Sequence, residues 1–164
     1  MTFTVPAQLE TELDELLTHY PEKRSAAVMF LHALQDHFGF ITPEAMEWTA
    51  ARLGLQPISV LELVTFYPMF RQQPVGKLHF KICRTLSCAL AGSYRLHQLF
   101  CEKLGLDCHQ PGPQTTPDGR CTVEFVECLA ACGAAPVMMC NDRFYEKLTE
   151  PMAEKMAAEH GFEP

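Results

Sequence analysis

The sequence predicts an α/β protein in two parts, a helical bundle over residues 1–72 and a small domain of strands and helices over residues 73–164. Apolar residues in the first part recur at the three- and four-residue spacing of helices, whereas after the segment RQQPVGK they alternate as in strands. The second part also holds two close pairs of cysteines, each placed where a predicted strand ends. The helices form the first part, and the strands position the cysteines in the second.

Four helices are expected in the first part, over residues 6–19, 22–38, 43–53 and 57–66. The clearest start signal is Thr42-Pro43, because threonine is a preferred helix cap and proline is favoured at the first helical position. Gly39 and Gly54 follow two of the helices and are typical stop residues. Pro68 prevents the fourth helix from continuing.

The second part begins with an alternating strand over residues 77–83, followed by a helix over residues 92–104 and a proline- and glycine-rich loop over residues 109–119. A second strand is expected over residues 122–127. Two short strands, 136–140 and 143–147, are joined by Asn141-Asp142, a favourable two-residue hairpin turn. A helix over residues 151–160 closes the chain. This order fits a small α/β sandwich of the thioredoxin type.

The cysteine pairs are Cys83 and Cys88, with four residues between them, and Cys128 and Cys132, with three. Both pairs are expected in loops just beyond strand ends, and two parallel neighbouring strands would bring them to one edge of the sheet. Four thiolates in two pairs suit a [2Fe–2S] cluster, with one pair for each iron. A cluster of this kind exchanges single electrons, so the sequence predicts an electron carrier.

Other uses of the cysteines remain open. The same four thiolates could hold zinc in an interaction domain, and the even count allows disulfides, although these are rare in cytosolic proteins. A thiol–disulfide oxidoreductase on this fold would want Cys-x2-Cys at a helix start, which the sequence lacks. The four remaining cysteines are expected to serve as small apolar residues: Cys101, Cys108, Cys121 and Cys140.

Composition excludes several classes of function. The net charge of −7 argues against nucleic-acid binding, although the tandem helices 43–53 and 57–66 resemble a helix-turn-helix. The start of the chain lacks the basic and apolar stretches of a secretory signal, and no apolar run is long enough to cross a membrane. We therefore expect a cytoplasmic protein. No glycine-rich nucleotide-binding motif occurs, so any flavin or nucleotide must belong to another chain.

Several strings together resemble the E-type family of small iron–sulfur subunits of NADH:quinone oxidoreductase (complex I). They cover the chain from Tyr20 to its end: YPEKRSA, TPEAM, VTFYPMF with RQQPVGK, the Cys-x4-Cys motif, TTPDGR, VEFVECLAACGAAPVMMCND and FYEKLT. Related subunits occur in NAD-linked hydrogenases and formate dehydrogenases, so an equivalent role in one of those enzymes is the alternative.

The resemblance implies a helical bundle followed by a thioredoxin-like ferredoxin domain, with a [2Fe–2S] cluster held by Cys83, Cys88, Cys128 and Cys132. It implies a partner subunit that holds FMN and the NADH site, and further complex I subunits beyond it. The cluster would exchange single electrons with that FMN, and the isolated chain would not be catalytic. The expected location is the cytoplasmic side of the inner membrane, as a peripheral part of the complex without membrane insertion.

Two features depart from the family pattern. Cysteines stand at positions 121 and 140, where apolar or aromatic residues are usual, and the loop 109–119 looks long. Neither affects the four candidate ligands. Arg84, directly after Cys83, is expected either to favour the reduced cluster by its positive charge, or to point into water or pair with an acid of the partner.

Overall fold

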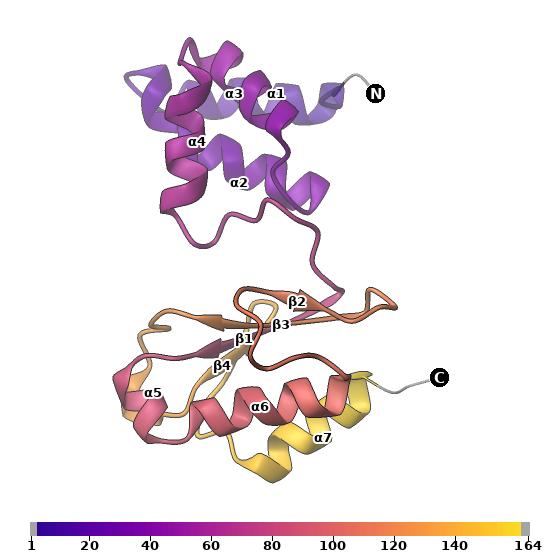
Figure 1. The fold of residues 1–164 in the computed structure, drawn as a ribbon. Coiled ribbons are helices and arrows are strands. Elements are labelled where there is room, and N and C mark those ends of the chain that lie inside the picture. The colour runs from indigo at the N-terminus through magenta and orange to yellow at the C-terminus, as the bar shows by residue number, and fades with distance from the viewer. Residues whose placement is uncertain (1–2, 162–164) are drawn as a thin grey trace. The chain divides into compact units, whose positions relative to one another are not determined.

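A computed structural model describes residues 3–161, without the side chains of the last two. The chain divides into two compact units, Met1–Pro74 and Val75–Pro164 (Figure 1). The first unit is entirely helical and the second combines a sheet with helices. The fold is therefore the predicted one, an N-terminal helical bundle and a thioredoxin-like α/β domain.

The first unit contains α1 (Ala7–Leu17), the short 3-10 helix η1 (Lys23–Ala26), α2 (Ala27–Phe38), α3 (Pro43–Leu53) and α4 (Pro57–Phe66). The expected second helix therefore begins with a 3-10 turn rather than as one continuous α-helix. The capping signal of α3 is confirmed, because Thr42 Oγ1 accepts a hydrogen bond from the Ala45 amide at 3.1 Å. The predicted ends of α2 and α3 are also confirmed, because Gly39 (φ 85°) and Gly54 (φ 68°) follow these helices in the left-handed region.

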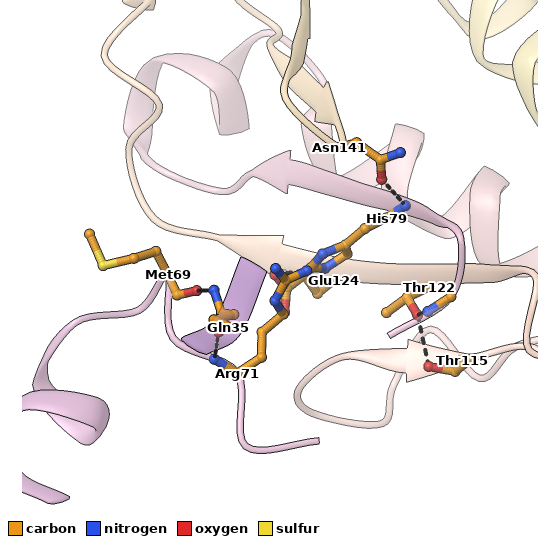
Figure 2. Close-up of polar contacts among 9 residues, drawn as sticks. Gln35, Met69, Arg71, His79, Thr115, Thr122, Glu124 and Asn141 are labelled. Atoms are coloured by element: carbon orange, nitrogen blue, oxygen red, sulfur yellow. Dashed lines mark hydrogen bonds and ion pairs between the residues drawn. The ribbon is translucent and has the colours of Figure 1, made fainter. Parts of the chain in front are cut away.

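A buried glutamine holds the segment after α4 against α2. The side chain of Gln35 is 5% exposed, donates to the Met69 carbonyl at 3.0 Å and accepts from the Arg71 amide at 2.7 Å (Figure 2). Both polar ends of the amide are thus satisfied by backbone inside the bundle, which a buried amide requires. The bundle core around it is formed by fully buried apolar residues, including Phe30, Leu31 and Leu34.

The second unit is built on a five-stranded sheet in the order β2-β3-β1-β4-β5. The strands are β1 (Leu78–Cys83), β2 (Gln114–Thr115), β3 (Cys121–Val126), β4 (Met138–Cys140) and β5 (Arg143–Tyr145). The central pair, β1 and β3, is parallel, and the other pairs are antiparallel. The predicted two-residue hairpin is confirmed, since Cys140 pairs with Arg143 and Asn141 takes φ 51°.

Helices α6 (Ser93–Leu104) and α7 (Glu150–Gly161) lie side by side on one face of this sheet (Figure 1). Alternate residues of β1 and β3 point into the resulting core, where Phe80, Ile82 and Val123 are fully buried. Phe80 packs on Phe100 of α6 with ring centroids 4.8 Å apart. Alternation in the sequence thus corresponds to one helix-covered face of the sheet.

Two short elements differ from the sequence prediction. The proline- and glycine-rich loop contains β2, which pairs with β3 through Gln114 and Thr115. The segment after Cys83 contains a five-residue helix, α5 (Leu86–Leu90), where a loop was expected. None of the helices within residues 3–161 is both long and apolar enough to span a bilayer.

Candidate functional site

The ends of β1 and β3 bring the two cysteine pairs to one edge of the sheet. Cys83 is the last residue of β1 and is in register with Val126, the last residue of β3. One further ladder bond runs from the Arg84 amide to the Val126 carbonyl at 3.0 Å, and Cys128 follows two residues later. The expected parallel neighbouring strands are therefore present, and they deliver both pairs to the same end.

The first pair is buried. Cys83 is 1% exposed and Cys88 is 2% exposed, and they form a small apolar cluster with Val137 that is separate from the main core. Cys88 lies on α5, so the expectation that this pair occupies a loop is wrong for its second member. A short helix can form here because Leu86–Leu90 contains no proline or glycine, whereas Gly92 interrupts the chain before α6 begins.

The second pair is exposed and lies on an irregular turn. The Sγ atoms of Cys128 and Cys132 are 3.9 Å apart. The Ala130 amide donates to Cys128 Sγ at 3.3 Å, and Ala130 takes φ 59°, a left-handed conformation that costs energy for any residue with a Cβ atom. Cys132 begins the 3-10 helix η2 (Cys132–Ala134), so it too lies on a short helical turn rather than a plain loop.

Hydrogen bonds toward sulfur favour the thiolate form in both pairs. Burial by itself raises the pKa of Cys83, but the Thr85 hydroxyl at 3.2 Å and nearby backbone amides outweigh burial and hold that pKa below its ordinary value. The pKa of Cys128 is lowered by the Ala130 amide and then by the Thr85 hydroxyl. Cys88 differs, because burial raises its pKa. Since thiolate is the form that binds metals, the polar groups around Cys83 and Cys128 favour ligand formation there.

The donor set fits a binuclear cluster. Two thiolates on one tetrahedral metal, each about 2.3 Å from it, lie about 3.8 Å apart. The observed separation of 3.9 Å between Cys128 and Cys132 is close to that distance. Within the described part of the chain, no three His, Cys, Asp or Glu side chains gather as ligands of one metal ion. A [2Fe–2S] cluster takes only two protein thiolates per iron, which is the arrangement of two separate pairs found here.

The other four cysteines lie away from this edge. Three are buried in the core between sheet and helices, and the fourth is half-buried against the same core: Cys101, Cys121, Cys140 and Cys108. Burial raises the pKa of Cys101 to about 11 and also raises the pKa values of Cys121 and Cys140. These three thiols stay protonated at neutral pH, as expected of cysteines that act as small apolar residues.

An ion pair at the site was not expected from the sequence. The Arg84 guanidinium donates to Glu127 Oε1 at 3.0 Å through Nε and at 2.5 Å through a terminal nitrogen. Arg84 follows Cys83 and Glu127 precedes Cys128, so the pair links the two ligand segments. The acid that pairs with Arg84 therefore belongs to this chain, whereas the sequence had suggested an acid of a partner as one of the alternatives. The parallel register of β1 and β3 is what brings the two residues together, and nothing local in the sequence signals it.

Comparison with known proteins identifies the family to which this chain is similar. Residues 13–160 match the family model described as thioredoxin-like [2Fe-2S] ferredoxin. The E-type subunit of NADH-quinone oxidoreductase from Aquifex aeolicus is 36% identical over 144 residues, which are 88% of this chain and 88% of that protein. The NADH-quinone oxidoreductase subunit 2 of Thermus thermophilus is 40% identical over 149 residues, which are 89% of this chain and 80% of that protein. The E-type subunit from Mycobacterium bovis is 34% identical over 152 residues, and this chain spans 59% of its length.

A solved structure shares the fold. The crystal structure of an NAD+-reducing [NiFe]-hydrogenase in the H2-reduced state aligns with a TM-score of 0.66 at 22% sequence identity. The alignment covers 79% of this chain and 22% of the hydrogenase chain, so this chain spans about a fifth of that protein. At this identity the likeness concerns the fold.

Proposed function

This chain belongs to the family of thioredoxin-like [2Fe–2S] ferredoxins, and we propose that it is the electron-transfer subunit of an NADH dehydrogenase module in NADH:quinone oxidoreductase. It carries one [2Fe–2S] cluster, held by Cys83, Cys88, Cys128 and Cys132. The observation that carries the ligand assignment is the delivery of both cysteine pairs to one sheet edge by the parallel strands β1 and β3. The names of the relatives from Aquifex and Thermus support the choice of host enzyme.

The residues of this chain bind the cluster and control its surroundings. When bound, the cluster supplies one-electron transfer, which matches a partner flavin that receives two electrons as hydride from NADH. The buried pair, Cys83 and Cys88, anchors one side of the site in apolar surroundings, where access of water is restricted. The exposed pair, Cys128 and Cys132, places the other side at the protein surface. A partner that exchanges electrons with the cluster would therefore approach it most closely on the side of the exposed pair.

The proposal includes the partner and the location. Because the sequence has no nucleotide-binding motif, NADH and FMN are assigned to a partner protein that docks near the exposed pair. The chain would then be a peripheral subunit on the cytoplasmic side of the inner membrane, together with the other subunits of the complex. It has no catalytic residue of its own in this scheme.

Single replacements test the ligand assignment. Alanine at Cys83, Cys88, Cys128 or Cys132 should abolish or severely destabilise the cluster, because one iron would lose one of its two protein ligands. The matched controls are alanine at the four core cysteines, which should keep full iron: Cys101, Cys108, Cys121 and Cys140. Iron content and visible absorption of the purified proteins are the measurements. Full iron in Cys128→Ala, or loss of iron in Cys121→Ala, would contradict the assignment. A colourless protein that contains zinc would instead show that the four cysteines form a zinc site.

Reconstitution tests the role. The purified chain should neither bind NADH nor oxidise it with artificial acceptors, and its cluster should be reduced by NADH only after a flavin-bearing subunit is added. Stoichiometric NADH binding to the single chain in a calorimeter would refute the assignment of the NADH site to the partner subunit.

A further inference from the structure

Thr85 occupies the cap position of α5 but does not cap it. Its backbone has φ −75° and ψ 166°, the extended conformation of a helix cap, and threonine is a residue type preferred there. Yet the side chain makes no capping hydrogen bond to the helix. Its Oγ1 lies 3.2 Å from Cys83 Sγ instead. A hydroxyl well placed to cap a helix is therefore directed at a candidate ligand of the first pair.

The contact with Cys83 lies in buried surroundings. Cys83 is 1% exposed, so water has little access to its sulfur, and the Thr85 hydroxyl is a side-chain group within hydrogen-bond distance of it. Ser87, which offers the same chemistry two positions further on, is exposed on α5.

We propose that Thr85 is a positioning residue whose hydroxyl donates a hydrogen bond to the sulfur of Cys83 and raises the reduction potential of the cluster. This inference rests on the ligand assignment proposed above. Once Cys83 is a thiolate bound to iron it carries no proton, so the hydroxyl is the donor in its contact with that sulfur. A donor to sulfur stabilises the more negative, reduced state more than the oxidised state. Removing the donor therefore lowers the potential.

The decisive variant is Thr85→Val, which keeps the branched shape and removes the hydroxyl. Because Thr85 makes no capping bond, valine removes no helix cap, and the change isolates the contact with sulfur. Thr85→Ser restores the hydroxyl, and Ser87→Ala removes an exposed hydroxyl of the same helix. The full chain with its cluster is titrated anaerobically, with EPR of the reduced cluster as the readout. Pulsed EPR in D2O reports exchangeable deuterons near the cluster.

The expected result is a lower midpoint potential and a weaker deuteron coupling in Thr85→Val, with both restored in Thr85→Ser and unchanged in Ser87→Ala. The shift should persist at high salt, because it comes from a hydrogen bond at contact distance and not from a distant charge. If Thr85→Val loses iron and Thr85→Ser regains it, the positioning role stands. An unchanged potential in Thr85→Val, or a serine variant that behaves like valine, overturns the proposal. A Cys128→Ala variant that kept full iron would instead mark failure of the ligand assignment.

Discussion

A buried hydroxyl in β3 fixes the start of β1, and its removal gives the sharpest test of how the sheet is held. Thr122 is fully buried, and its Oγ1 accepts from the Gly76 amide at 2.7 Å. The same oxygen lies 2.8 Å from the hydroxyl of Thr115 on β2 (Figure 2). Thr122 therefore joins three segments of the sheet at the end opposite the cysteines.

Thr122→Val replaces the hydroxyl by a methyl group of similar volume, so it creates no cavity. It leaves the buried Gly76 amide without its acceptor, and an unsatisfied buried donor costs about 1–3 kcal/mol. For a unit of this size each kcal/mol lowers the melting temperature by about 4–8 °C. We expect a loss in that range, with an unchanged denaturant slope because the surface exposed on unfolding does not change.

Urea unfolding of the cluster-containing chain, followed by the visible circular dichroism of the cluster, measures the stability of the second unit alone. Thr115→Val is the matched control. Its side chain is exposed, and Gly76 keeps its acceptor, so the loss should stay well below that of Thr122→Val. A loss under about 0.5 kcal/mol in Thr122→Val, or equal losses in both variants, would refute the reasoning.

Three further predictions concern the close approach of Gly76 to β3, the charges beside the site and the cap of α3. Gly76→Ala should lower the unfolding free energy by about 1–3 kcal/mol, since a Cβ atom at this position would lie 2.7 Å from the backbone of β3. The control is Gly133→Ala, whose added Cβ atom meets no atom within 4 Å and which should be neutral in the same urea assay. Equal stabilities of these two variants would contradict the close approach. In redox titrations, Arg84→Gln should lower the midpoint potential of the cluster and Glu127→Gln should raise it, and both shifts should shrink as salt is added. Shifts of the same sign in the two variants would show that the ion pair does not act through charge. Thr42→Ala should cost about 1 kcal/mol by removing the cap of α3, measured by far-ultraviolet circular dichroism in urea, and an unchanged midpoint would show that the cap is dispensable.

Local sequence signals were enough for most of the elements. Thr42-Pro43 set the start of α3, Gly54 set its end, and the segment from Pro57 to Phe66 forms α4 with the predicted bounds. Alternation identified β1 and β3, and Asn141-Asp142 identified the turn between β4 and β5. These features depend on a residue and its near neighbours, through capping, φ preference and the repeat of apolar side chains, so the sequence carries them directly.

The short elements could not be predicted in this way. Helix α5 has five residues and β2 has two, which is too short for a helical or alternating repeat to show. The helix α5 and the 3-10 turn η2 carry Cys88 and Cys132, so the backbone around these two candidate ligands was described wrongly even though the residues themselves were singled out.

The sequence was sufficient to predict the fold class, the longer helices and strands, and the four cysteines that suit a cluster. Which residues of distant segments lie next to one another depends on the tertiary structure. The parallel register of β1 and β3 sets Cys83 opposite Val126, and from that register follow the Arg84–Glu127 ion pair and the delivery of both cysteine pairs to one sheet edge. Contacts between segments more than 40 residues apart depend on strand pairing and register, which many sequences with the same local pattern could satisfy differently.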